Sequence, residues 1–197
     1  STIPSQYSYL KANPKKEKSW EEKLGSKRLL RVGLVWNGGF RADQPEMWAI
    51  NERRNIPLEM IARLQHLNNI QFYSLQKGNP AEEELERNKS AVWPTNNLLN
   101  FVPELKDFSD TAALIAHLDL VISVDTSTAH LAAALGKPTW ILNRYDTCWR
   151  WLEDRLDSPW YPSVKLYRQN TPGNWEEVMD LVEKDLKAVA QQHTQSI

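Results

Sequence analysis

The most regular signal in the chain is an alternation of short apolar runs with longer amphipathic segments. Continuous apolar runs over residues 29–36, 70–75, 118–124, 139–142 and 164–167 predict strands covered on both faces, and residues 99–102 indicate one more short strand. Apolar stripes at helical spacing predict helices over residues 57–67, 80–89, 111–116, 128–135 and 175–190. Because the two kinds of element alternate, we predict an α/β fold, a Rossmann-like parallel sheet flanked by helices.

Several helix ends are marked by residues whose chemistry suits a terminus. Asp110 and Asn174 can cap the helices that follow them, because their side chains accept hydrogen bonds from unpaired backbone N–H groups. Gly136 and Pro138 come directly after the run TAHLAAAL and predict its end. Parallel sheets of this kind bind ligands outside the carboxyl ends of their strands, so the residues that follow each strand are the candidates for function.

Residues 1–28 differ from the rest of the chain. They carry seven basic and three acidic side chains, an excess of four positive charges. Ser19 and Glu22 have the spacing of a capping box and predict a short helix over residues 19–24. We predict a basic N-terminal arm or linker over 1–28, a domain over 29–190 and a tail over 191–197. The arm is interpreted either as a solvated linker or as a surface for an anionic partner.

Composition narrows the class of protein. The 197 residues suit about one domain, and a formal net charge of −1 argues against nucleic-acid binding through bulk positive charge. No apolar run approaches the ~20 residues that a membrane span needs, and no signal peptide is visible. Cys148 is the only cysteine, which excludes an internal disulfide and a multi-cysteine metal site. These features predict a cytoplasmic protein without a membrane span.

The sequence Asp-Thr-Ser-Thr-Ala-His at residues 125–130 follows the strongest strand and opens the next helix. The hydroxyls of Thr126, Ser127 and Thr128 stand beside unpaired N–H groups at the positive end of the helix dipole, an arrangement that favours an anion such as a phosphate. Simple capping of the helix explains one hydroxyl but not three. Asp125 stands where a carboxylate can accept hydrogen bonds from sugar hydroxyls, and its alternative role is a second cap. His130 is either a phosphate donor or a structural residue.

Two further loops follow predicted strands. Lys77, in the sequence SLQKG, can reach a phosphate as a point charge, although most lysines in loops are solvated. Asn37, Gly38 and Gly39 follow the first strand, where adjacent glycines allow close backbone approach to a ligand or form a tight turn.

Other site chemistries find no support in the sequence. A Gly-x-Gly-x-x-Gly fingerprint, a Walker A loop and a Gly-x-Ser-x-Gly elbow are absent. No His-Glu-x-x-His or paired Cys/His spacing supports a metal site, so we expect no metal and no cofactor. The nine tryptophans indicate large buried areas or flat stacking surfaces.

Several of these pieces occur in the order known from one family. The stretches RVGLVWNGG, FYSLQKG, DLVISVDTSTAHLAAALGKPTWIL and WRWLEDRLDSPWYPSVKLYRQ resemble the glycosyltransferase-like C-terminal region of bacterial tetratricopeptide-repeat proteins. That region is similar to the donor half of the heptosyltransferases and, more distantly, of the O-linked N-acetylglucosamine transferases. The resemblance covers roughly residues 29–190.

The resemblance implies a GT-B glycosyltransferase, in which two Rossmann-like halves face each other across a cleft and the C-terminal half binds a nucleotide-diphosphate sugar without a metal. Asp125 would then face the sugar, and the loop Asn37, Gly38 and Gly39 would border the cleft. The residues implied to bind the diphosphate are Lys77, Thr126, Ser127, Thr128 and His130. Those implied to lie near the base or ribose are Glu104, Lys106, Asp107 and Phe108.

A GT-B enzyme also needs an N-terminal half, which commonly supplies the acceptor site and the general base. Residues 1–28 are too few to form it, so we expect this chain to be a fragment that is incomplete for transfer by itself. The missing partners would be that half or a tetratricopeptide-repeat region, together with a glycan or protein acceptor. One alternative is a non-catalytic nucleotide-binding or protein-interaction module, favoured by the aromatic segment 149–161. A nucleotide-sugar hydrolase or epimerase is a third interpretation.

Overall fold

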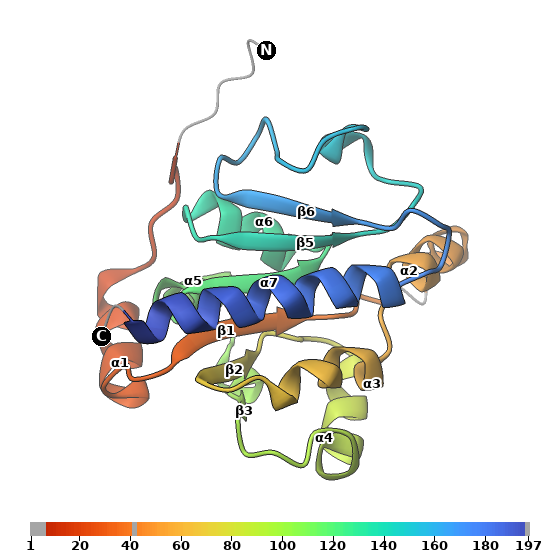
Figure 1. Ribbon diagram of the computed structural model, residues 1–197. Helices are drawn as coiled ribbons and strands as arrows, with labels where there is room; N and C mark the ends of the chain where they lie inside the picture. The colour runs from red at the N-terminus through yellow and green to blue at the C-terminus, as the bar shows by residue number, and fades with distance from the viewer. Residues whose placement is uncertain (1–6, 41–42, 196–197) are drawn as a thin grey trace.

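Six parallel strands form one sheet in the computed structural model, which describes residues 7–40 and 43–195 (Figure 1). The strands lie in the order β3-β2-β1-β4-β5-β6, so the order reverses between the neighbours β1 and β4. This arrangement confirms the predicted Rossmann-like sheet. The strands are β1 (Leu30–Val35), β2 (Ile70–Ser74), β3 (Leu98–Asn100), β4 (Leu120–Val124), β5 (Thr139–Asn143) and β6 (Val164–Arg168).

Helices cover both faces of the sheet. One face is covered by α3 (Leu58–Ile61), α4 (Ala81–Val92) and the long α7 (Glu176–Gln195), which crosses the centre of the sheet in Figure 1. The other face is covered by α5 (Phe108–Ala116) and α6 (Ser127–Ala134), with α1 (Pro14–Leu24) packed against α5. The short α2 (Trp48–Arg54) lies at the edge where β1 ends (Figure 1).

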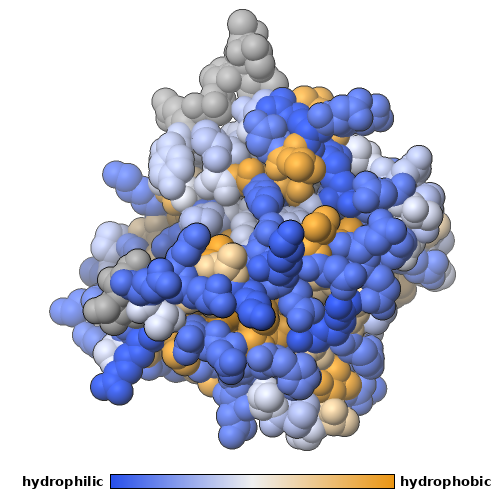
Figure 2. Space-filling view, in the orientation of Figure 1, coloured by the Kyte–Doolittle hydropathy of each residue, from blue (hydrophilic) through white to orange (hydrophobic). Residues whose placement is uncertain are grey.

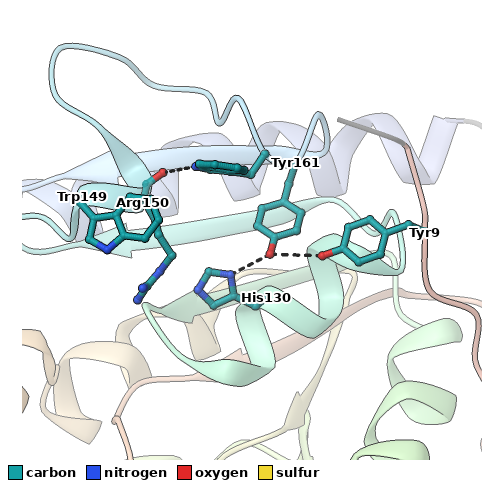
Figure 3. A pocket seen from close by; sticks show the side chains of 6 residues that line it. Tyr9, His130, Trp149, Arg150 and Tyr161 are labelled. Atoms are coloured by element: carbon teal, nitrogen blue, oxygen red, sulfur yellow. Dashed lines mark hydrogen bonds between the residues drawn. The ribbon is translucent and has the colours of Figure 1, made fainter. Parts of the chain in front are cut away.

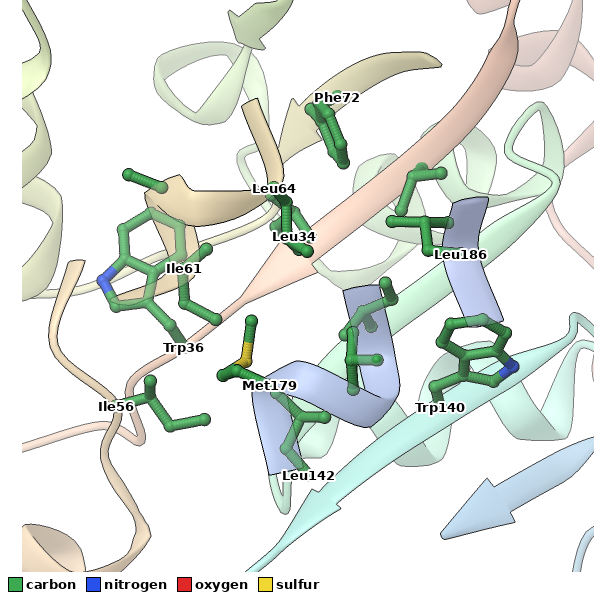
Figure 4. Close-up of a cluster of buried hydrophobic side chains, with 14 of the residues drawn as sticks. Leu34, Trp36, Ile56, Ile61, Leu64, Phe72, Trp140, Leu142, Met179 and Leu186 are labelled. Carbon is green, nitrogen blue, oxygen red and sulfur yellow. The ribbon is translucent and has the colours of Figure 1, made fainter. Parts of the chain in front are cut away.

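The two central strands explain the continuous apolar runs. Every residue of β1 and β4 is buried, because helices lie above and below them. Between the sheet and α7, Leu34, Phe72 and Leu142 meet Met179 and Leu186 in the largest hydrophobic cluster (Figure 4). At about 25 cal/mol for each Å² of apolar surface removed from water, this burial is the main source of stability.

Three predicted elements differ in the structure. The helix expected over 57–67 is α-helical only as far as Ile61 and continues as a 3-10 helix over Ala62–His66. Helix α5 is capped by Asp107 rather than by Asp110, since the Asp107 carboxylate accepts a 2.9 Å hydrogen bond from the Asp110 amide. Helix α7 runs to Gln195, past the expected end at residue 190. The last two residues of the expected tail, 196–197, lie outside the described residues.

The segment expected to be an arm contains a packed helix. The cap of α1 is Asn13, whose side chain accepts from the amides of Lys15 and Lys16, and not the predicted Ser19 with Glu22. The helix begins one turn earlier because Asn13 is followed by Pro14, which suits the first helical position. Trp20 is 7% exposed and packs edge-on against Phe101. Residues 1–6 of the expected arm lie outside the described residues.

The connection from β5 to β6 is unusual for a parallel sheet because it holds no α-helix. It contains the 3-10 helix Trp149–Trp151 and a long loop. Trp151 is fully buried against the alanine face of α6 and the strands β5 and β6. Ser158 accepts hydrogen bonds from the amides of Trp160 and Tyr161, at 3.2 and 3.3 Å, and so fixes the loop before β6. Aromatic side chains thus take the place of the crossover helix.

The outer surface on the side of α7 is mostly hydrophilic, with small separate apolar patches (Figure 2). Within residues 7–40 and 43–195, no helix combines the length and the apolar character that crossing a membrane requires.

The burial of Trp20 predicts that α1 stabilises the rest of the fold. Trp20→Ala should lower the free energy of unfolding by about 3 kcal/mol, since a large buried ring is replaced by a cavity. Trp149→Ala, at a tryptophan that is 67% exposed, should lower it by less than about 1 kcal/mol. Urea unfolding followed by circular dichroism measures both. If both variants lost the same small amount of free energy of unfolding, α1 would not belong to the part of the fold that unfolds cooperatively.

Candidate functional site

The turn between β4 and α6 has the geometry of a capped helix N-terminus. Thr126 is extended, with φ −137° and ψ 166°, and its hydroxyl accepts from the Ala129 amide at 3.4 Å. The same hydroxyl lies 3.0 Å from the Ser123 hydroxyl, in the preceding strand. Thr126 is therefore used as the cap. The amides of Ser127 and Thr128, the first two of the helix, have no partner within the helix and face the carboxyl edge of the sheet.

Asp125 and His130 form a pair beside this turn. His130 Nε2 lies 3.5 Å from Asp125 Oδ1, and both side chains are largely buried. Burial by itself raises the pKa of Asp125. The His130 imidazole and the positive charge of Arg150 favour the carboxylate more strongly, so that the pKa lies below its ordinary value of 3.8. The turn therefore offers an ionised carboxylate next to the helix N-terminus at neutral pH.

His130 is held from more than one side. Its Nδ1 lies 3.0 Å from the Tyr161 hydroxyl, and its ring stacks on Trp151 with centroids 5.0 Å apart and planes at 17°. The Tyr161 hydroxyl also lies 3.5 Å from that of Tyr9, from the segment before α1 (Figure 3). Burial and this hydroxyl pair raise the pKa of Tyr161 above its usual range. The imidazole is thus fixed in orientation by residues from three separate segments.

The loop after β1 meets this turn at the point where the strand order reverses. Gly38 is buried, and its amide donates to Asn55 at 2.8 Å. A β-carbon on Gly38 would lie 1.9 Å from Nη2 of Arg54, so only glycine leaves room for the guanidinium. Arg54 Nη1 donates to the Asp125 carbonyl at 2.9 Å, and Nη2 donates to Asn51. Arg54 therefore joins the loops after β1 and β4 and adds a positive charge between them.

Gln76 ties the loop after β1 to the loop after β2. Its side-chain oxygen accepts from the amides of Trp36 and Asn37, at 3.1 and 2.9 Å, and its nitrogen donates to the Asn37 carbonyl at 3.1 Å. The neighbouring Lys77 is exposed, and its ammonium donates to the Leu105 carbonyl in the next loop. Lys77 thus lies at the carboxyl edge, as predicted, with its side chain turned toward the loop after β3.

The residues expected near the base or ribose are engaged with α1. Glu104 forms an ion pair with Lys23, and Asp107 caps α5 while it pairs with Lys16 at 3.1 Å. The amide of Lys106 donates to Asp110 at 3.0 Å, and Phe108 is 60% exposed. Hydrogen bonds from the Asp110 amide and Lys16 lower the pKa of Asp107. A hollow of about 590 Å³ remains between α1 and this loop.

An aromatic pocket lies on the other side of His130. Its volume is about 310 Å³. In Figure 3, Trp149 and Arg150 lie on one side, Tyr9 and Tyr161 on the other, and His130 lies between them. Trp160 completes the lining, and its indole N–H donates to the Arg150 carbonyl at 2.9 Å.

Sequence reasoning missed Arg54, Arg150, Tyr161 and Tyr9 as site residues. The segment before Ile56 was longer and more charged than a minimal βα loop, and this was the available signal for Arg54. Tyr9 and Tyr161 are 152 positions apart, and no local pattern predicts their contact. Among the described residues, no group of three His, Cys, Asp or Glu side chains is arranged to hold a metal ion.

Comparison with known proteins gives one family match. Residues 59–151 match the model of glycosyltransferase family 9 (heptosyltransferase), a stretch that includes Lys77 and the turn 125–130. The chain is also 30% identical over 196 residues to Protein FlbA of Caulobacter vibrioides. This alignment covers 95% of this chain and 30% of that protein. The chain thus spans less than a third of the length of this curated relative.

Solved structures show the same fold at low identity. ADP-heptose lps heptosyltransferase II from E. coli matches with a TM-score of 0.62 and 17% identity, over 98% of this chain and 56% of that one. A glycosyl transferase family 9 structure from Veillonella parvula matches with a TM-score of 0.63 and 11% identity, over 100% and 56%. The heptosyltransferase-like resemblance is confirmed at the level of the fold. The association with tetratricopeptide repeats stays a prediction.

The lowered pKa of Asp125 predicts a specific dependence of stability on pH. A carboxyl group whose pKa is lower in the folded state stabilises the fold above its unfolded pKa, and this contribution is lost as the pH falls through the folded pKa. Asp125→Asn should therefore be less stable than the parent at pH 6, and the two should converge below about pH 4. Urea unfolding across this range measures the difference. A difference that stays constant with pH would contradict the assignment.

Proposed function

We propose that this chain is the donor-binding half of a GT-B glycosyltransferase and holds a nucleotide-diphosphate sugar. One observation carries the proposal: α6 begins at the reversal of strand order, where Asp125 and Arg54 flank its free amides. Sheets of this order bind nucleotides in the crevice at that position. The family match over residues 59–151 supports the same class of reaction.

The diphosphate is assigned to the start of α6. The Thr126 hydroxyl is used in capping, so the hydroxyls of Ser127 and Thr128 and the first amides of the helix are the donors that remain for phosphate oxygens. Lys77 and Arg54 supply positive charge from the neighbouring loops. Glycosyl transfer breaks the bond between the sugar and the diphosphate and leaves negative charge on the latter. Fixed donors and cations stabilise that charge, and the proposal therefore needs no metal.

The sugar is assigned to the side of Asp125. Its carboxylate, kept ionised beside His130, can accept hydrogen bonds from two neighbouring hydroxyls of a sugar ring. The acceptor site and the general base are assigned to the remainder of a longer protein, because this chain spans 56% of the heptosyltransferase structure that it resembles. We therefore expect binding of the donor without efficient transfer by these 197 residues.

Titration with nucleoside diphosphates tests the proposal. ADP, UDP or GDP should raise the melting temperature, by an amount that corresponds to ~2.7 kcal/mol at a hundredfold excess over Kd. Lys77→Ala should weaken binding of that diphosphate about tenfold and leave binding of the nucleoside unchanged, because only a charge-assisted phosphate contact is lost. Lys187→Ala, at an exposed lysine on α7, is the matched control and should have no effect.

The outcome of that titration separates the interpretations. Binding that survives chelation with EDTA supports the assignment of charge neutralisation to Lys77, Arg54 and the helix start. If no diphosphate binds at millimolar concentration, the donor site is wrong, and the non-catalytic interaction module becomes the better interpretation. Equal losses for diphosphate and nucleoside in Lys77→Ala would remove Lys77 from the phosphate role.

A pair of adjacent glycines tests the role of Arg54. Gly38→Ala places a β-carbon on the guanidinium, which must move away from the Asp125 carbonyl, whereas Gly39→Ala meets no atom of the described residues within 4 Å. Because an arginine side chain can shift at low cost, Gly38→Ala should lower stability by no more than about 1 kcal/mol. It should weaken diphosphate binding about tenfold. Calorimetric titration of both variants measures this, and equal affinities would exclude Arg54 from the site.

A further inference from the structure

The lining of the aromatic pocket next to His130 includes none of the proposed diphosphate donors Ser127, Arg54 and Lys77. It opens between the β5–β6 loop and the segment before α1, and its six lining residues are Tyr9, His130, Trp149, Arg150, Trp160 and Tyr161. Its volume of about 310 Å³ is at the lower end of the range for small-molecule sites. Four of the six residues are tyrosine or tryptophan, and Trp149 is 67% exposed, so that its ring is available to a ligand.

The lining also contains polar groups that can receive a ligand. Arg150 lines the pocket, and its guanidinium donates hydrogen bonds and carries a positive charge. The guanidinium carbon lies 5.6 Å from the centre of the Trp149 ring, so the two side chains form one wall (Figure 3). Opposite them, the hydroxyls of Tyr9 and Tyr161 both donate and accept hydrogen bonds. The walls therefore combine aromatic faces with donors and acceptors.

The geometry of the rings narrows the class of ligand. The planes of Trp149 and Trp160 are at 86°, and those of His130 and Tyr161 at 58°, so these neighbouring pairs form corners and not a parallel slot for a flat base. A purely apolar ligand would remove water from the Arg150 guanidinium and the tyrosine hydroxyls without offering them hydrogen bonds, which is costly. A cationic ligand would be repelled by the Arg150 charge.

A neutral sugar ring satisfies all of these conditions. A pyranose presents C–H groups on its face, which the negative face of an aromatic ring attracts, and hydroxyls around its rim. Trp149 can hold the face, while Arg150 and the tyrosine hydroxyls can bind the rim. The His130 ring separates this pocket from Asp125, since it lines the pocket and faces the carboxylate through Nε2.

We propose that this pocket is a carbohydrate subsite that binds one neutral pyranose ring, distinct from the donor sugar assigned to Asp125. Its use as a glycan subsite in transfer rests on the proposed function, whereas the binding of a sugar does not. Tyr9 reaches the pocket from the segment before α1, where the amides of Tyr9 and Leu10 both donate to the Ala134 carbonyl, at 3.0 and 3.1 Å. The subsite thus combines Tyr9, near the start of the chain, with residues between 130 and 161.

Ligand-observed NMR with methyl pyranosides tests the inference. The methyl α- and β-glycosides of glucose, galactose, mannose and N-acetylglucosamine are titrated against the whole chain. At the usual efficiency per ligand atom, a dissociation constant of about 1 mM is expected for the best of them. Trp149→Ala should weaken its binding about tenfold, and Trp149→Phe should restore part of the loss because it keeps an aromatic face. Trp48→Ala, at an exposed tryptophan outside the pocket, is the matched control.

The same variants decide the outcome. The inference is overturned if no glycoside gives saturation transfer at 50-fold excess over that ~1 mM, or if Trp149→Ala and Trp48→Ala bind alike. It is also overturned if adenosine or uridine competes for the pocket with higher affinity than every glycoside, which would make it a base site. Lys77→Ala should leave sugar binding unchanged, so that failure of the diphosphate site and failure of this pocket are read in separate experiments.

Discussion

The reversal of strand order between β1 and β4 is the constraint on which the other features depend. In a parallel sheet with right-handed crossovers, the chain leaves these two neighbours toward opposite faces, so the segments that follow their carboxyl ends diverge. Arg54 from α2 lies between these segments, beside Gly38, and donates to the Asp125 carbonyl. The reversal thus determines which residues meet at this point of the carboxyl edge.

The second determinant is the missing helix between β5 and β6. A crossover helix would cover α6 and the edge of the sheet with aliphatic side chains, whereas here Trp151 does so from a 3-10 turn. The small residues of α6 let this ring approach closely and stack on His130. The same 3-10 turn carries Trp149 and Arg150, and the irregular part of the loop carries Tyr161, so that all three residues line a pocket. The loop that packs Trp151 at the sheet edge therefore also supplies side chains that line the pocket.

The sequence predicted the strands to within about two residues, because burial on both faces leaves continuous apolar runs that few other structures produce. The residue that caps each helix was harder to predict. Asp107 and Asp110 are both suitable caps, and Lys16 of α1 pairs with both of them, at 3.1 and 2.6 Å, so no local pattern indicated that Asp107 is the cap. The turn 125–130 could be predicted because strand, cap and helix are consecutive. Arg54, Tyr9 and Tyr161 could not, since their positions depend on contacts that only the folded chain brings together.

The loops on the two sides of the carboxyl edge are connected by different kinds of contact. Toward β2 and β3, the Gln76 side chain bonds the backbone of Asn37, and the Lys77 side chain bonds a backbone carbonyl in the next loop, so each connection joins one side chain to main-chain atoms. Toward β5 and β6, the connection runs through side chains, from Asp125 to His130 and Tyr161. A connection of the first kind depends on the identity of one side chain, whereas the second kind needs matched side chains at both ends. Under the proposed function, we therefore expect substitutions on the β5–β6 side to change specificity for the ligand most.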